Sequence, residues 1–153
     1  MDWILDQLSA SSEEVLSRLG THWQQHFNTG TFSWQSHAFW TQGFAYCDMH
    51  KAAPDLYQQL SHSDFIAFKG DLNYRKMVGD RYWPLYTPFR DSLCGFEPAP
   101  FIALRTLKAE TCPGLPAEAI QRMGKEFGAE DRGWMVSSEY AVAQLFLPSS
   151  ESH

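Results

Sequence analysis

DFIAFKGDLNYRKMVGD, residues 64–80, is the stretch of this 153-residue sequence that decides its fold class. Phe65–Phe68 form an apolar run that is too short for a helix, which favours a buried strand. Polar residues and a glycine follow at Lys69–Asn73, and a helix can begin at Tyr74–Met77. A strand, a turn and a helix in succession are the building unit of α/β folds, so we predict the α/β class.

The polar end of this stretch is also a candidate site. In an open α/β sheet, ligands bind beyond the carboxyl ends of the strands, and a helix N-terminus offers free N–H groups to an anion. The stretch therefore indicates an anion or phosphate site. A plain strand-to-helix connection with solvated charges explains the same residues equally well.

Length and composition limit the alternatives. With 44% hydrophobic and 15% aromatic residues, the chain has enough apolar material for the core of one domain. A net charge of −6 argues against a general nucleic-acid or anionic-membrane surface. Three cysteines without CxxC spacing suggest neither a disulfide framework nor structural zinc. No apolar run approaches the length of about 20 residues that spans a bilayer. We expect a soluble, unsecreted protein of the cytoplasm or also the nucleus.

The amino-terminal third indicates helices and then an aromatic segment. Ser11 and Glu14 have the spacing of a capping box, and an apolar stripe behind them predicts a helix to about Asn28. His22 and His26 would share one face of that helix, but two histidines are more readily explained as solvated than as a metal site. For the aromatic residues of 31–48 we predict strand and loop that cover the core, with a partner-binding or carbohydrate-stacking surface as the alternative.

A second apolar run repeats the arrangement of the first. Phe101–Leu104 predict a short buried strand that is followed by Arg105, Thr106 and Lys108. If the two strands are parallel neighbours, their carboxyl ends bring the polar residues that follow them to one rim of the sheet. These residues are Lys69, Asp71, Asn73, Arg75, Arg105 and Lys108.

The chemistry of that rim suits a sugar phosphate. Arg75 or Arg105 can form a bidentate pair with phosphate, and Lys108 can act as a compact point charge. Thr106 can donate a hydrogen bond, while Asp71 and Asn73 suit sugar hydroxyls. An ion pair of Asp71 with either arginine is the alternative role for that carboxylate, and a solvated surface lysine is the alternative for Lys108.

Further elements are expected around this rim. Pro54 predicts a helix that ends near Leu60, and Phe89–Leu93 predict another short helix. A polar helix is expected at Ala117–Phe127, and Tyr140–Leu147 are expected to close an edge of the sheet.

Two stretches carry a resemblance to a known family. They are FKGDLNYRKMVGD at Phe68–Asp80 and FEPAPFIALRTLKAE at Phe96–Glu110. Together they resemble the metal-dependent damage-control phosphatases, in particular the subfamily with an Arg-Thr-x-Lys motif that is also named acidic-residue or protein-glutamate methyltransferases. Supporting similarity extends over nearly the whole chain, including Phe39–Trp40 and Ala53–Tyr57.

The resemblance implies a three-layer α/β/α sandwich with a Rossmann-like sheet, of which residues 1–153 would be a single, incomplete, carboxyl-terminal domain segment. It implies hydrolysis of sugar phosphates such as fructose 1-phosphate, supported by manganese, cobalt or nickel. Residues 105–108 match the subfamily motif as Arg105, Thr106, Leu107 and Lys108. By the same match, the substrate-binding residues are Asp71, Leu72, Asn73, Tyr74, Arg75 and Lys108.

One departure from the family concerns the metal. The family's ligands are an Asp-Asn pair and a further Asp, whereas the two asparagines here, Asn28 and Asn73, follow Phe27 and Leu72. We therefore expect no catalytic residue and no metal ligand in this chain. The expectation is a carboxyl-terminal fragment or short isoform that is inactive alone and that associates through exposed sheet surface.

Two further functions stay open. The chain could bind a sugar phosphate without hydrolysing it. Transfer of a methyl group from S-adenosylmethionine to protein carboxylates is implied only by the family's second name, and no glycine-rich nucleotide loop supports it.

Overall fold

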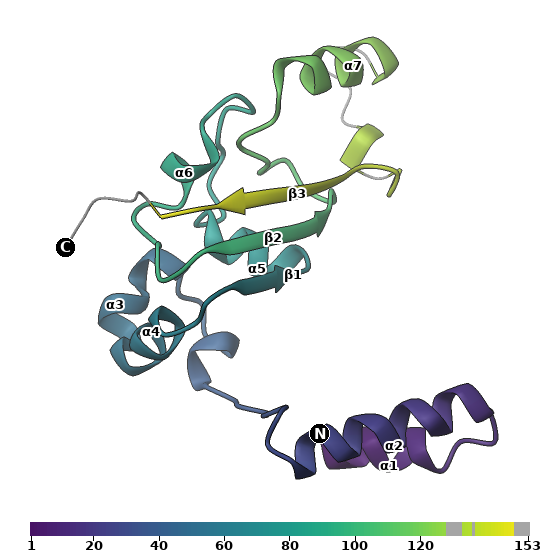
Figure 1. Cartoon of the computed structure of the whole chain (residues 1–153). Helices are drawn as coiled ribbons and strands as arrows, with labels where there is room; N and C mark the ends of the chain where they lie inside the picture. Colours follow the sequence, from purple (N-terminus) through teal and green to yellow (C-terminus); the bar gives the residue numbers. More distant parts are fainter. Residues whose placement is uncertain (128–132, 136, 149–153) are drawn as a thin grey trace. The chain divides into compact units, whose positions relative to one another are not determined.

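The computed structural model describes residues 1–127, 133–135 and 137–148. The chain divides into two compact units, residues 1–40 and residues 41–153. The first unit is helical, and the second contains the sheet (Figure 1).

Two helices form most of the first unit. These are α1 (Asp2–Ser9) and α2 (Glu14–Asn28), which pack against each other. They approach closely at Gly20, where an added Cβ would lie only 2.5 Å from the backbone nitrogen of Ser9. The predicted helix is confirmed, but its capping box is wrong. The helix begins after Glu13, and the Ser11 hydroxyl accepts a bond from the Glu13 N–H at 3.2 Å instead of capping Glu14.

The aromatic segment contains short helical turns where strand and loop were predicted. They are η1 (Ala38–Thr41) and η2 (Tyr46–Asp48). Phe32 and Trp34, and again Phe44 and Tyr46, stand two residues apart as in a strand, but the turns at 38–41 and 46–48 interrupt that spacing, so no continuous strand forms. Phe39 and Tyr46 are fully buried, whereas Trp34 is 65% exposed. Covering of the core is thus confirmed for part of the segment only.

Helices α3 (Met49–Ala52) and α4 (Pro54–Ser61) then lead to the sheet. Pro54 stands in the first turn of α4, as predicted. The sheet has the order β1-β2-β3, with β1 (Ile66–Lys69) parallel to β2 (Phe101–Thr106) and β3 (Ala141–Phe146) antiparallel to β2 (Figure 1). The predicted parallel pair and the predicted edge strand are both confirmed.

One face of this sheet holds the core. Phe68, Phe101 and Phe146 lie on it, with ring centroids 5.5 Å apart for the first two and 4.9 Å for the last two. Helix α5 (Asp71–Met77) contacts β1 and β2. The single helical turn α6 (Phe89–Ser92) contacts β3.

The opposite face of the sheet is more open among the described residues. Leu104 and Leu145 lie there and are 37% and 55% exposed. The structure therefore confirms a mixed α/β fold, while the three-layer Rossmann-like sandwich stays a prediction. So does association through this face.

A smaller cluster lies beyond the end of β2. Leu107, Cys112, Met123 and Trp134 are buried together between the chain after β2, helix α7 (Ala117–Phe127) and the turn η3 (Gly133–Met135). Helix α7 has the predicted bounds. In the part of the chain that the structure describes, no helix is both long and apolar enough to cross a membrane.

Candidate functional site

The candidate site begins where β1 turns into α5. Gly70 makes this turn with a φ of 101°, a conformation that L residues with side chains rarely adopt. Its N–H donates to the Leu104 carbonyl oxygen at 2.8 Å, which ties the turn to β2. The helix begins at Asp71, three residues earlier than predicted. Asp71 thus stands beside the end of β2.

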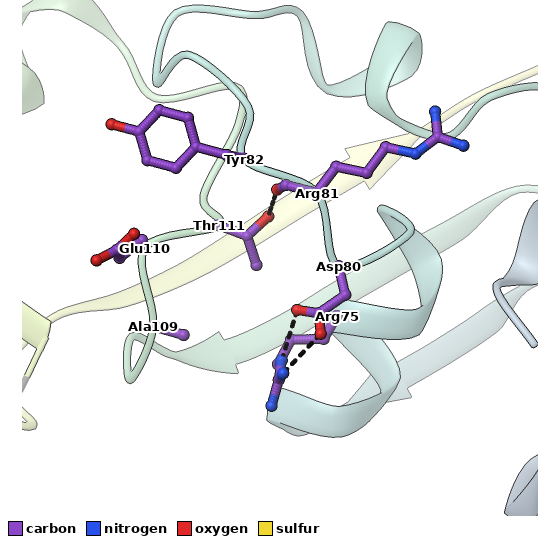
Figure 2. Close-up of a pocket in the computed structure, with 7 residues that line it drawn as sticks. All are labelled: Arg75, Asp80, Arg81, Tyr82, Ala109, Glu110 and Thr111. Atoms are coloured by element: carbon purple, nitrogen blue, oxygen red, sulfur yellow. Dashed lines mark hydrogen bonds and ion pairs between the residues drawn. The ribbon is translucent and has the colours of Figure 1, made fainter. Parts of the chain in front are cut away.

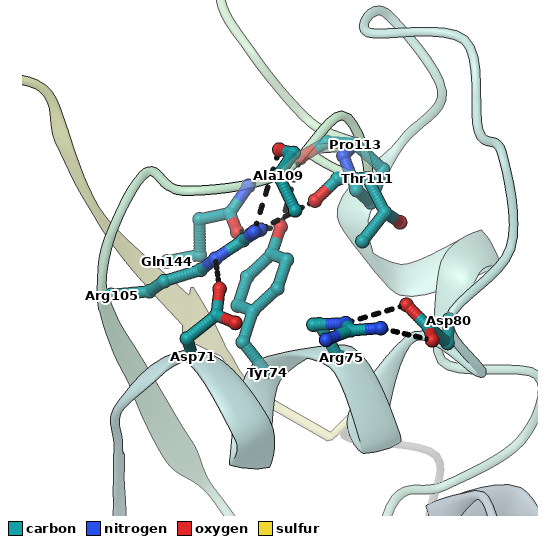
Figure 3. Close-up of polar contacts among 9 residues, drawn as sticks. All are labelled: Asp71, Tyr74, Arg75, Asp80, Arg105, Ala109, Thr111, Pro113 and Gln144. Atoms are coloured by element: carbon teal, nitrogen blue, oxygen red, sulfur yellow. Dashed lines mark hydrogen bonds and ion pairs between the residues drawn. The ribbon is translucent and has the colours of Figure 1, made fainter. Parts of the chain in front are cut away.

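The Arg105 side chain closes this junction from the β2 side and has no exposed surface. Its Nε donates to Asp71 Oδ1 at 2.8 Å, while Nη1 and Nη2 donate to the carbonyl oxygens of Thr111 and Ala109 (Figure 3). A guanidinium so enclosed has no edge left for a phosphate fork. The predicted phosphate pair is therefore wrong for Arg105, and the alternative ion pair with Asp71 is confirmed.

The Tyr74 ring packs against the Arg105 guanidinium. The Arg105 Cζ lies 4.5 Å from the centroid of the Tyr74 ring, a cation–π contact. The Tyr74 hydroxyl donates to Gln144 Oε1 at 2.7 Å, and Gln144 Nε2 donates to the Pro113 carbonyl oxygen at 2.6 Å. Burial raises the pKa of Tyr74 far above its usual value, so the phenol stays a donor. Helix α5, strands β2 and β3 and the loop after β2 are thereby joined.

Other predicted residues point elsewhere. The Asn73 side chain donates to the Lys69 carbonyl oxygen at 2.7 Å and accepts from the Tyr46 hydroxyl at 2.6 Å. Lys69 pairs with Leu104 and shares the open face with it, whereas Arg105 lies on the covered face. Leu72 is 64% exposed. The single rim predicted from sequence is therefore split between two faces of the sheet.

Arg75 lies one helical turn after Asp71 and is paired. Its Nε donates to Asp80 Oδ1 at 2.7 Å and its Nη2 to Asp80 Oδ2 at 2.6 Å. The hydrogen bond from Arg75 holds the pKa of Asp80 below its usual value, and the same bond raises the pKa of Arg75. The two side chains are 42% and 52% exposed, so this pair stays accessible to a ligand.

A cavity of about 290 Å³ lies between the carboxyl-terminal end of α5, with the residues that follow it, and the loop after β2 (Figure 2). It is lined by Arg75, Asp80, Arg81, Tyr82, Ala109, Glu110 and Thr111. The sequence motifs did not place Arg81, Tyr82 or Glu110 at the site. Their closeness in sequence to the ends of the two motifs was the available signal.

Lys108 lies in the loop whose next residues line this cavity, and it is exposed. Arg105 holds that loop through the Ala109 and Thr111 carbonyl oxygens. The loop therefore carries the Lys108 ammonium group next to the lining residue Ala109, and Arg75 lines the same cavity from α5. The Arg81 guanidinium points away from the other lining residues (Figure 2), and its Nη1 donates to Cys94 Sγ at 3.5 Å. An ammonium group and a guanidinium group such as those of Lys108 and Arg75 are the side chains that commonly bind a phosphate dianion.

A second cavity, of about 360 Å³, lies at the strand ends. It is lined by Lys69, Gly70, Leu104, Arg105, Thr106, Ala141, Val142 and Ala143. Thr106 is exposed and faces away from the α5 side, because adjacent strand residues point to opposite faces.

Comparison with known proteins identifies the family of this chain. Residues 1–123 match the family described as the damage-control phosphatase ARMT1-like domain. The chain belongs to this family. It is similar to the damage-control phosphatase ARMT1 of Danio rerio, with 41% identity over 150 residues, which are 98% of this chain and 33% of that protein. The Homo sapiens protein of the same name is 39% identical over 148 residues, or 96% of this chain and 32% of that protein.

The ARMT1 of Xenopus laevis is 40% identical over 144 residues, which are 94% of this chain and 32% of that protein. The chain thus spans about a third of the length of these curated ARMT1 relatives, and it matches their carboxyl-terminal part.

A metal centre of the kind expected for the damage-control phosphatases does not fit the described residues. No three His, Cys, Asp or Glu side chains among residues 1–127, 133–135 and 137–148 are grouped so that they could hold an ion. His22 and His26 contact each other, with their Nε2 atoms 3.0 Å apart, and stay a pair.

Proposed function

We propose that this chain binds the phosphate and sugar groups of a sugar phosphate, such as fructose 1-phosphate, as part of a damage-control phosphatase. The observation that carries the proposal is the bond between Asp71 and Arg105. It connects the Asp71–Arg75 motif to the Arg105–Lys108 motif, and Arg75 from the first motif lines one cavity together with residues 109–111, which follow the second.

Each side chain has a distinct part in this proposal. The exposed cations, Lys108 and Arg75, hold the phosphate. Asp71 uses Oδ1 for Arg105 and is 30% exposed, which leaves Oδ2 to accept a sugar hydroxyl bond. Because the Arg105 guanidinium offsets the charge of Asp71, that carboxylate can stand close to a phosphate with reduced repulsion.

Hydrolysis needs more than binding of the phosphate and sugar groups. When bound, a divalent ion such as manganese, cobalt or nickel polarises the phosphoryl group and activates water. The described residues offer no ligand set for such an ion, and the sequence has no Asp-Asn pair. We therefore propose that this polypeptide alone binds the sugar phosphate without turning it over.

Phosphate release tests the second part of the proposal. Purified chain is incubated with fructose 1-phosphate and manganese, and inorganic phosphate is measured over time. The expected result is no release above the buffer control. Robust manganese-dependent turnover by the pure chain would show that the proposed inactivity is wrong.

Titration calorimetry tests binding. Fructose 1-phosphate should bind, fructose should not, and Lys108→Ala should weaken the affinity about tenfold or more through the loss of a charged contact. Lys51→Ala is the matched control, because Lys51 is an exposed lysine on α3. Equal affinities for wild type and Lys108→Ala would contradict the assigned role of Lys108.

A further inference from the structure

Asp80 is fixed to the end of helix α5 by its backbone. The helix ends at Met77, and Gly79 and Asp80 follow with φ values of 73° and 51°. The Asp80 N–H donates to the Arg75 carbonyl oxygen at 2.7 Å. Asp80 is therefore bonded to Arg75 twice, once through its backbone N–H and once through its carboxylate. The backbone bond holds Asp80 next to the side chain with which its carboxylate pairs.

The carboxylate occupies one particular edge of the guanidinium. It accepts from Nε and Nη2, the side edge, and the third nitrogen, Nη1, lies on the side away from Asp80 (Figure 3). A guanidinium has five N–H donors in a planar fork. Two of them point to Asp80, so the terminal edge formed by Nη1 and the second Nη2 hydrogen is left for a bidentate acceptor.

We propose that Asp80 is a positioning residue, which turns the terminal edge of Arg75 toward the phosphate of a bound sugar phosphate. This inference rests on the function proposed above. An unpaired arginine side chain has many rotamers, and fixing it in advance lowers the entropy lost on binding. Asp80 fixes the orientation of Arg75 without occupying the edge that binds the ligand.

The opposite role would be competition, in which Asp80 must leave before Arg75 can bind phosphate. The two roles predict opposite effects of Asp80→Asn. If Asp80 positions Arg75, the neutral amide, which has only one acceptor oxygen, weakens binding of fructose 1-phosphate. If Asp80 competes, the same substitution strengthens binding.

The experiment measures the affinity for fructose 1-phosphate by titration calorimetry in four proteins: wild type, Asp80→Asn, Arg75→Lys and the double variant. Asp80→Asn should raise the dissociation constant about fivefold or more in the wild-type background, because the bidentate fork loses its orientation. It should have no further effect in Arg75→Lys, since an ammonium group has no second edge to orient. Asp64→Asn is the control, with the same loss of charge at an exposed aspartate before the amino end of β1.

The outcomes separate the possibilities. Unchanged or tighter binding by Asp80→Asn overturns the inference, and so does an equal loss in both backgrounds, which would indicate a merely structural role. Absence of binding by the wild-type chain overturns the proposed function together with this inference. Wild-type binding with an ineffective Asp80→Asn overturns the inference alone.

Discussion

Replacing Arg105 with alanine should destabilise the fold far more than replacing Arg75 with alanine, although each arginine is paired with an aspartate. The two environments differ. The Arg105 side chain has no exposed surface and donates to Asp71, Ala109 and Thr111, whereas the Arg75 side chain is 42% exposed and pairs with Asp80 at the surface.

The magnitudes follow from this burial. Removing one partner of a buried ion pair costs about 3–5 kcal/mol of unfolding free energy. Asp71 is 30% exposed and can regain some water, so we expect the lower end, about 3 kcal/mol, for Arg105→Ala. The exposed Arg75–Asp80 pair is screened by solvent, and its loss should cost roughly 0–1 kcal/mol.

Urea unfolding followed by tryptophan fluorescence measures both values, and the sequence has six tryptophans to report it. With a typical urea slope of about 2 kcal/mol per molar for a small protein, Arg105→Ala should lower the unfolding midpoint by about 1.5 M. Arg75→Ala should move the midpoint by less than about 0.5 M. Similar shifts for the two variants would refute the structural role assigned to Arg105.

Three other perturbations have defined outcomes. Gly70→Ala should cost about 1–3 kcal/mol in urea unfolding, because the φ of 101° there suits glycine alone; a neutral result would contradict the strained turn. Tyr74→Phe should cost about 1–3 kcal/mol, since the Gln144 Oε1 acceptor loses its donor, and a Gln144→Leu background should reduce this cost in a double-mutant cycle. Burial raises the pKa of the Cys112 thiol from 9.0 to about 11. Between these values the thiol of the unfolded chain ionises, while the thiol of the folded chain stays protonated. The free energy of unfolding should therefore be unaffected below pH 9 and should fall as the pH rises toward 11. The fall should be smaller in Cys112→Ala, and identical pH profiles of the unfolding free energy for the two proteins would contradict the assignment.

Much of the framework could be predicted from the sequence, because short apolar runs between turn signals leave few alternatives. Phe65–Phe68 and Phe101–Leu104 predicted the two parallel strands, and Ala117–Phe127 predicted α7 with its observed bounds. The beginning of α5 was misplaced because Asp71–Asn73 have the composition of a turn. With Gly70 before it, Asp71 instead begins the helix.

The site was predicted less completely, and Arg105 shows why. The predicted strand ended at Leu104, which left Arg105 as a free cation after it. In the structure β2 continues to Thr106, and the alternation that buries Phe101 and Ala103 also buries Arg105. Strand alternation extended by two residues would have predicted this. No local pattern could predict that Ala109 and Thr111 supply its acceptors, because that depends on how the loop closes.

The Asp71–Arg75 motif and the loop after β2 are proposed to form one sugar-phosphate site, and a single NMR titration tests this most directly. Backbone amide chemical shifts of the assigned chain are followed while fructose 1-phosphate is added. A shared site predicts saturating changes that are largest at residues 71–75 and 106–111, with no such changes on adding fructose. Absence of saturable changes, or changes confined to helices α1 and α2, would contradict it.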